Sequence, residues 1–410
     1  MQDKTAISLA PPTKEAGMGI EPFRLAVPDR DLESLRRRLR ETRWSADFAN
    51  DDWAYGTNAA WLKTLVDYWI DGYDWRAQEA AINAVPQFRT QIGGVPVHFV
   101  HCRGKGNAPI PLIMSHGWPW TFWDFARMIG PLTDPAAHGG APADCFDVVI
   151  PSLPGFGFSS PLDVPGIGAV QTADLWHTLM TERLGYRRYA VHGGDWGGFV
   201  SAQLAHKHHD SVIGMHALGG APLDCFNKPL PSAEEYAPDE AGWFEKTANF
   251  FARESGYSAI QSTKPQTLSY GLVDSPVGLA AWLVEKRRGW SDCEGEVERR
   301  FSRDELLTSI MIYWLTQTIG TAARYYYESW RSPWQPAHAL QPPVPVPVGI
   351  LKLDHDVCHW PRSTMEPFFN IARWTRSAVG GHFAPAEVPE LVTDELRAFF
   401  RPLRAADGRP

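Results

Sequence analysis

The stretch Gly193-Gly194-Asp195-Trp196-Gly197 decides the fold. It follows the short apolar run Tyr189–Val191 and precedes a helical pattern, so it lies at a strand-to-helix turn. Small residues on both sides of a central side chain are typical of a sharp turn that presents a nucleophile, because the two backbones come close together there. We therefore expect Asp195 to stand at the end of a buried strand.

The chemistry of this turn depends on its central residue, which is usually Ser but here is Asp195. A carboxylate that attacks a saturated carbon forms an ester, which water can later hydrolyse. A Ser would form an ether at the same carbon, which is a dead end. Asp195 thus indicates displacement at saturated carbon and excludes a Ser esterase; the alternative is a glycine-rich turn with an incidental Asp.

The other parts of a catalytic triad follow in the order nucleophile, acid, His. His382 lies in Gly380-Gly381-His382-Phe383, just after the predicted strand Trp374–Val379. Asp354 and Asp356 both follow the predicted strand Pro345–Leu353, and either could be the acid. We expect His382 to deprotonate a water molecule while the acid orients its imidazole.

A second loop, His116-Gly117-Trp118-Pro119, follows the apolar run Ile110–Met114. In this arrangement a backbone N–H from that loop and the N–H after the nucleophile form an oxyanion hole. The expected donors are the amides of Trp118 and Trp196. We expect the substrate pocket to be lined by Trp118, Pro119, Trp196 and Phe383.

A metal site is the alternative reading of the segment that holds Asp354, His355, Asp356 and His359. The spacing of these side chains matches no standard ligand set, and a triad acid already explains one of the carboxylates. We therefore expect neither a metal ion nor a cofactor.

Strands alternate with helices along most of the chain, which predicts an α/β fold with a mainly parallel sheet. Residues 223–338 break this alternation with helical, aromatic-rich segments, as an inserted cap would. We place an N-terminal arm at 1–90, the first part of the core at 91–222, the helical cap at 223–338 and the second part of the core at 339–410. In the arm, Leu32, Leu35 and Leu39 have helical spacing.

Composition limits the possible partners and compartment. The 410 residues carry a net charge of −8, which argues against nucleic acid as a partner. The five cysteines form no CxxC pair, and residues 1–17 contain no apolar segment, so we expect a cytoplasmic protein with reduced thiols and no membrane anchor. The Trp-rich stretch 53–75 could pack on its own chain or on a second subunit, so a homodimer is possible.

The motifs together resemble the α/β-hydrolase epoxide hydrolases. The Asp-containing turn, His116–Pro119 and Pro154-Gly-Phe-Gly-Phe-Ser159 carry the resemblance, which is closest to the microsomal and juvenile-hormone branch and runs from Glu21 to about Phe400. It implies an α/β-hydrolase core, a cap inserted in the core and an N-terminal segment that wraps around both. The microsomal members carry an N-terminal membrane anchor. Because residues 1–17 of this chain contain no apolar segment, it is expected to be a soluble relative.

The resemblance also implies site residues that composition alone would assign to the core. Tyr257, in Glu254–Pro265, and Tyr326, in Arg324–Glu328, match the two cap tyrosines that donate hydrogen bonds to the epoxide oxygen. Tyr325 and Tyr327 are the alternatives for the second donor. The resemblance favours Asp356 over Asp354 as the triad acid.

These residues predict an epoxide hydrolase that converts an apolar epoxide and water to a vicinal diol through an ester on Asp195. One alternative is a haloalkane dehalogenase, which also uses an Asp followed by a Trp. Against it, Trp118 stands where that family often has an Asn for halide, and the paired tyrosines would have no role. A catalytically silent binder of apolar ligands is the other alternative, and the apparently complete triad argues against it.

Overall fold

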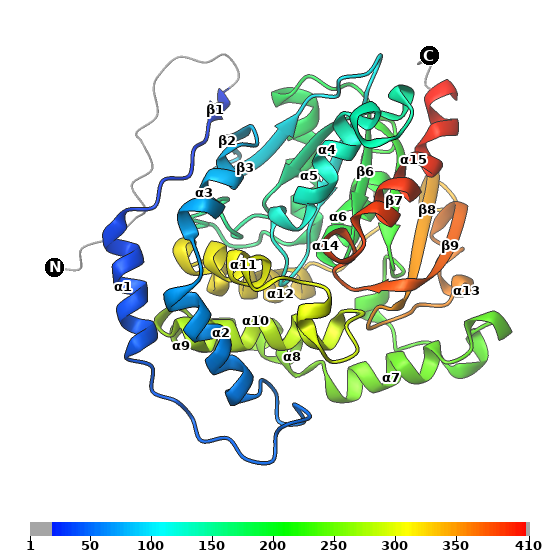
Figure 1. The fold of residues 1–410 in the computed structure, drawn as a ribbon. Helices are drawn as coiled ribbons and strands as arrows, with labels where there is room; N and C mark the ends of the chain where they lie inside the picture. Colours follow the sequence, from blue (N-terminus) through cyan, green and yellow to red (C-terminus); the bar gives the residue numbers. More distant parts are fainter. Residues whose placement is uncertain (1–18, 407–410) are drawn as a thin grey trace.

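A nine-stranded sheet organises residues 19–406, the part of the chain that this computed structural model describes (Figure 1). The strand order is β1-β2-β3-β5-β4-β6-β7-β8-β9. Strands β4 to β9 are all parallel to one another. Strands β1, β2 and β3 continue the sheet beyond β5, each antiparallel to its neighbour. Their bounds are Glu21–Pro22, Gln87–Ile92, Val95–Cys102, Ile110–Ser115, Phe146–Pro151, Tyr189–Gly193, Val212–Leu218, Val344–His355 and Phe369–Gly381 for β1 to β9.

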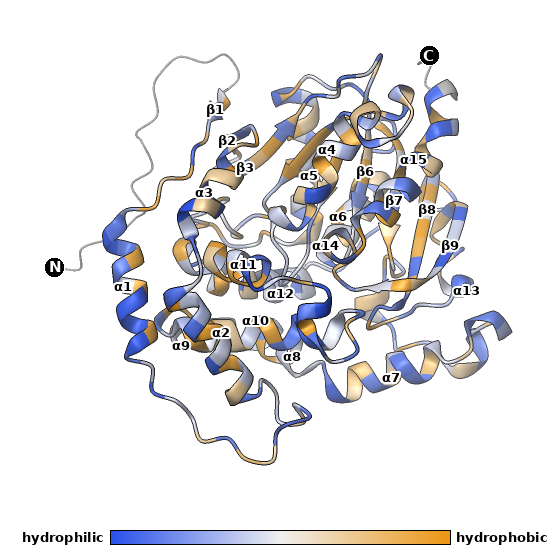
Figure 2. Cartoon of the chain, in the orientation of Figure 1, coloured by the Kyte–Doolittle hydropathy of each residue, from blue (hydrophilic) through white to orange (hydrophobic). Residues whose placement is uncertain are grey.

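The expected mainly parallel α/β architecture is confirmed. Strands β4 to β7 are almost wholly buried, and Figure 2 shows the centre of the sheet coloured as hydrophobic. Residues 1–17, for which the sequence predicts no membrane anchor, lie outside the described residues.

Helices cover both faces of the sheet. The chain moves from β4 through α4 (Ala126–Thr133) to β5 in one direction, and from β5 through α5 (Ala169–Thr178) to β6 in the other. Because such crossovers are right-handed, α4 and α5 lie on opposite faces. Helix α6 (Trp196–Lys207) packs on α5, whereas α14 (Ala384–Glu387) and α15 (Pro389–Ala406) pack on α4.

The helical insertion expected at 223–338 lies between β7 and β8 and forms a cap below the carboxyl ends of the strands (Figure 1). Its helices are α7 (Trp243–Arg253), α8 (Gly256–Thr263), α9 (Pro265–Asp274), α10 (Pro276–Trp290), α11 (Arg303–Thr316) and α12 (Ile319–Arg331). Helices α8 and α9 both pack on α12, so this part of the cap is a connected layer.

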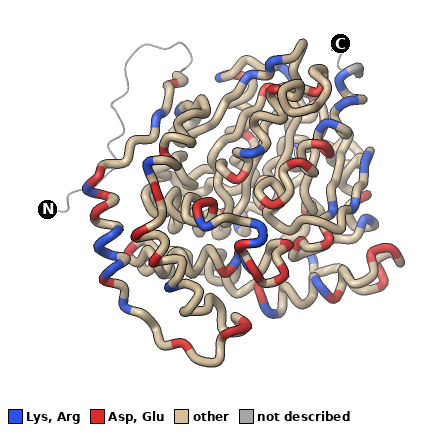
Figure 3. The backbone as a smooth tube through the Cα atoms, in the orientation of Figure 1, with Lys and Arg blue, Asp and Glu red and all other residues tan. Residues whose placement is uncertain are grey.

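The N-terminal arm runs from the sheet edge to the cap. It contains α1 (Asp29–Arg40), which buries Leu32, Leu35 and Leu39 as predicted, α2 (Ala59–Asp71) and α3 (Trp75–Asn83). The boundary expected at residue 90 falls inside β2. Helix α1 is acidic in its first turn and basic in its last, where Arg38 pairs with Asp274 of the cap at 3.0 Å (Figure 3).

The Trp-rich stretch packs on its own chain. Trp69 and Trp75 are buried, and two tyrosines join the arm to α11: the Tyr68 hydroxyl donates to Asp304 at 2.7 Å and the Tyr73 hydroxyl lies 2.9 Å from that of Thr308. The arm is therefore bound to the cap through α11. Whether the chain also forms a homodimer stays a prediction.

The turn at Asp195 requires its small neighbours. Asp195 has φ 51° and ψ −130°, a backbone conformation that is rare for a residue with a side chain. A Cβ atom on Gly197 would lie 1.9 Å from the carbonyl oxygen of Ser115, and one on Gly193 would lie 2.2 Å from that of Gly197. The end of β4 thus leaves no room for a side chain at Gly197, and the first turn of α6 leaves none at Gly193.

A matched pair of alanine variants tests this steric account. Gly197→Ala should lower stability by about 3 kcal/mol or more, because the methyl group would overlap backbone that cannot move independently. Gly198→Ala is the control. Its Cβ would lie 3.7 Å from the carbonyl oxygen of Gly193, the nearest atom beyond its own helix, and Ala favours the helix. Thermal unfolding followed by circular dichroism measures both; equal unfolding temperatures for the two variants would contradict the account.

Candidate active site

The neighbouring strands β4 and β6 bring the loop of Trp118 to Asp195. They are parallel and in register, with Ser115 opposite Gly193, so the segments that follow them meet at one edge of the sheet. The Trp118 N–H donates to Asp195 Oδ1 at 2.8 Å, and a Cβ on Gly117 would lie 2.3 Å from the same oxygen. The structure thus brings the first expected oxyanion donor to Asp195. Trp196 begins α6 directly after Asp195, and its amide stays a predicted donor.

The neighbouring strands β8 and β9 join the acid to the His in the same way. His355 is opposite Gly381, so Asp356 and His382 follow a paired position. His382 Nδ1 lies 2.8 Å from Asp356 Oδ1, and His382 Nε2 lies 3.5 Å from Asp195 Oδ2. Of the two candidate acids, only Asp356 contacts His382.

The remaining polar residues of this segment have other partners. Asp354 pairs with Arg376 at 2.6 Å, His355 pairs with Asp292 at 3.4 Å, and the His359 ring stacks on Trp243. Within residues 19–406 no group of three or more His, Cys, Asp or Glu side chains could hold a metal ion.

The charges around His382 favour its imidazolium form. Burial disfavours that form, but the carboxylates of Asp356 and Asp195 outweigh burial and raise the pKa of His382 to about 10. Burial also acts against the charge of Asp356, yet His382 lowers the pKa of that carboxyl to about 2. The raised pKa of His382 depends on the two carboxylates that flank its ring, whereas the lowered pKa of Asp356 depends chiefly on His382.

The two expected cap tyrosines face the same cavity as Asp195. Tyr257, on α8, stacks on Trp118 with ring centroids 4.9 Å apart, and it meets Tyr326, on α12, edge to face at 5.8 Å. The Tyr326 hydroxyl is buried and has no hydrogen-bond partner within 3.5 Å among the described residues; the polar groups near it are those of Tyr257 and Trp196. Burial and then nearby groups, including the Asp195 carboxylate, raise the pKa of both phenols, which therefore keep their protons at neutral pH.

The two alternatives to Tyr326 are occupied elsewhere. The Tyr325 hydroxyl donates to Thr172 Oγ1 at 2.9 Å. The Tyr327 ring lies under the Arg331 guanidinium, 3.5 Å from its central carbon, and is only half-buried. Tyr326 is thus the residue of this run whose hydroxyl is free within the cavity.

The Pro154–Ser159 motif fixes the position of α12. The Gly157 N–H donates to Thr318 Oγ1 at 3.2 Å, just before the helix begins. In its first turn, the Thr321 hydroxyl donates to the carbonyl of Gly155. These bonds tie the helix that carries Tyr326 to the core.

A cavity of about 520 Å³ lies between the core and the cap. It is lined by Asp195, Tyr257, Tyr326, Asp356 and His382, and its other walls are largely apolar and aromatic. Trp196 lines it as expected, but Trp118, Pro119 and Phe383 are not among its lining residues. Trp118 stacks behind Tyr257 and Phe383 packs behind Trp290, so these rings form a second layer.

Trp290 is one of the lining residues that the sequence did not reveal. Its ring meets His382 edge to face at 5.1 Å, and its carbonyl accepts the N–H of His382 at 2.8 Å. It stands at the end of α10 in a segment with no chemical pattern, so no sequence signal marked it.

A strand-end Asp, a His–Asp pair and an inserted cap define an α/β-hydrolase with a carboxylate at the nucleophile position. Two family models match the chain: one described as "Epoxide hydrolase N terminus" over residues 20–125 and one described as "alpha/beta hydrolase fold" over residues 110–333. The chain belongs to the epoxide hydrolase family and has the α/β-hydrolase fold.

Relatives support this assignment over nearly the whole chain. One from Stigmatella aurantiaca (strain DW4/3-1) is 40% identical over 388 residues, which cover 94% of this chain and 86% of the relative. Epoxide hydrolase 1 of Sus scrofa is 35% identical over 406 residues, which cover 93% and 88%. The crystal structure of juvenile hormone epoxide hydrolase from Bombyx mori matches with a TM-score of 0.84 at 27% identity, covering 95% of this chain and 96% of that one.

The same comparisons establish that the protein is an epoxide hydrolase. In the part of the chain from residue 19 to 406, no helix is both long and apolar enough to cross a membrane.

The charge arrangement predicts the titration of His382. Asp195→Asn should lower the pKa of His382 below about 10, because the neutral amide removes one of the two flanking carboxylates. Asp356→Asn should lower it as well, because it removes the other carboxylate. NMR titration with isotope-labelled histidine measures the pKa, and Asp354→Asn is the control because Asp354 pairs with Arg376. An unchanged pKa in Asp195→Asn would contradict this assignment.

Proposed function

We propose that the protein hydrolyses apolar epoxides to vicinal diols through a covalent ester on Asp195. The observation that carries the proposal is the shared cavity of Asp195, His382 and the two buried phenols, of which Tyr326 has an unpartnered hydroxyl. An epoxide oxygen in the cavity could accept a hydrogen bond from this hydroxyl. The largely apolar walls favour an apolar substrate.

In the first half-reaction, Tyr257 and Tyr326 donate hydrogen bonds to the epoxide oxygen. Asp195 Oδ1 remains on the Trp118 amide, which leaves Oδ2 to attack a ring carbon. The new bond joins Oδ2 to that carbon, the ring C–O bond breaks, and the released oxygen takes a proton from a phenol.

The second half-reaction begins when the imidazolium of His382 gives its proton to the phenolate, since the neutral ester no longer stabilises the positive charge. Neutral His382 then takes a proton from water, and the resulting hydroxide adds to the carboxyl carbon of Asp195. The negative charge develops on Oδ1, where the Trp118 amide stabilises it. The bond from the carboxyl carbon to Oδ2 then breaks, and Oδ2 leaves in the diol with the proton from His382. The other water proton passes from the carboxyl group of Asp195 to His382, which is again an imidazolium, and Asp195 retains the water oxygen.

The electrostatics support this order of events. While Asp195 is ionised, two carboxylates raise the pKa of His382 to about 10. Formation of the ester neutralises Asp195 and leaves only Asp356 beside the imidazole. The pKa of His382 therefore falls at the stage at which a base is needed, and hydrolysis of the ester should slow as acid protonates His382.

The role of Tyr326 can be tested within its own tyrosine run. Tyr326→Phe should slow formation of the ester from styrene oxide by about 10²–10³-fold, because it removes one donor to the developing alkoxide. Rapid-quench single turnovers with enzyme in excess measure that step. Tyr327→Phe is the matched control and should react like the wild type. A loss confined to Tyr327→Phe, or no loss in Tyr326→Phe, would refute this assignment.

A further inference from the structure

Glu387 is a buried carboxylate beside the catalytic His that the proposed reaction does not use. It lies in α14, just after the loop that carries His382. Its Oε1 accepts the N–H of Phe383 at 2.8 Å, and its Oε2 accepts the N–H of Gly381 at 3.0 Å. The two residues that flank His382 are thus held by one side chain.

The same carboxylate also reaches the cap. Glu387 Oε2 accepts the N–H of Asp292 at 2.8 Å, from the segment that follows α10. Two residues earlier, the Trp290 carbonyl accepts the N–H of His382. A Cβ on Gly381 would lie 2.6 Å from the Asp292 nitrogen and 2.7 Å from the Trp290 oxygen, so the two backbones are in direct contact.

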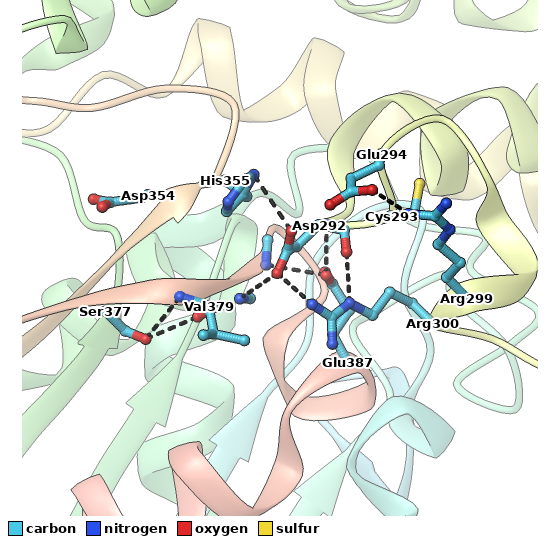
Figure 4. Close-up of polar contacts among 12 residues, drawn as sticks. Asp292, Cys293, Glu294, Arg299, Arg300, Asp354, His355, Ser377, Val379 and Glu387 are labelled. Atoms are coloured by element: carbon cyan, nitrogen blue, oxygen red, sulfur yellow. Dashed lines mark hydrogen bonds and ion pairs between the residues drawn. The ribbon is translucent and has the colours of Figure 1, made fainter.

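Asp292 completes the connection, as Figure 4 shows. Its Oδ2 accepts the N–H of Gly380 at 3.0 Å and pairs with Arg300, and its Oδ1 lies 3.4 Å from His355 Nδ1. The backbone N–H groups of Gly380, Gly381 and Phe383 therefore all donate to Glu387 or Asp292. The N–H of His382 itself donates to Trp290.

We propose that Glu387 is a positioning residue for His382, which it clamps between the core and the cap through Asp292. The inference rests on the proposed two-step reaction. Both oxygens of Glu387 accept backbone N–H groups, and an ionised carboxylate offers acceptors on both oxygens. Burial raises the pKa of Glu387 to about 7, while the three amides and the charge of His382 act against that increase.

This role separates the two half-reactions. Formation of the ester needs Asp195 and the phenols, whereas hydrolysis of the ester needs His382 at a fixed place relative to the carboxyl carbon. Glu387→Gln keeps the size of the side chain but turns one acceptor into an NH₂ group that meets a backbone N–H. The loop should shift and displace His382. The ester should therefore still form at the wild-type rate but should accumulate, because its hydrolysis is slowed.

Intact-mass spectrometry after rapid mixing with excess styrene oxide tests this. Glu387→Gln should accumulate the enzyme–substrate adduct and show about tenfold to hundredfold slower release of diol, as expected for a displaced catalytic group. Glu390→Gln, the same change at an exposed position three residues later, is the matched control and should behave like the wild type. Asp292→Asn should accumulate adduct in the same way, and it replaces Glu387→Gln if that variant does not fold.

The outcomes separate the inference from the proposed function. Equal slowing of both steps, or no adduct in variants whose diol release has slowed, would overturn the positioning role, provided that His382→Gln accumulates adduct. Diol release at the wild-type rate in both Glu387→Gln and Asp292→Asn would overturn it too. If His382→Gln also forms no adduct, the covalent route itself has failed. Adduct in Glu387→Gln but not in Asp195→Asn supports both the positioning role of Glu387 and the covalent route through Asp195.

Discussion

The negative charge of Asp195 is the constraint on which the rest of the site depends. Its side chain is only 18% exposed and faces a largely apolar cavity, where an uncompensated carboxylate would be costly. Three features offset this cost: the Trp118 N–H on Oδ1, the amino end of α6 and the imidazole of His382 near Oδ2. Each comes from a different segment, and the sheet brings them together because β4, β6 and β9 are parallel strands that end at one edge.

The cap completes the site from the other side. It supplies Tyr257 and Tyr326, and it also contacts His382 through Trp290. Two tethers fix its position: the Pro154–Ser159 loop bonds to the start of α12, and the N-terminal arm bonds to α11. The geometry between phenols and nucleophile is therefore set by contacts outside the cavity as much as by the residues that line it.

The local parts of this site were predictable, and the non-local parts were not. Asp195 and His382 lie in turns whose sequences reveal them, and the resemblance selected Asp356, which the structure then joins to His382. Strand β7 was not predicted because Gly214 and His216 interrupt its apolar run. Glu387, Asp292 and Trp290 escaped prediction because they act on backbone groups of a distant segment, and such contacts leave no pattern in side-chain chemistry.

The central claim is that Asp195 itself transfers an oxygen to the substrate, and a single turnover in ¹⁸O water tests it most directly. Purified protein in excess over styrene oxide is incubated beside an Asp195→Ala control, and the diol is analysed for label. The account predicts an unlabelled diol in the first turnover, label only after repeated turnovers, and no diol from the variant. Label in the first diol would mean that water attacks the epoxide directly, and it would contradict the role of Asp195 as nucleophile.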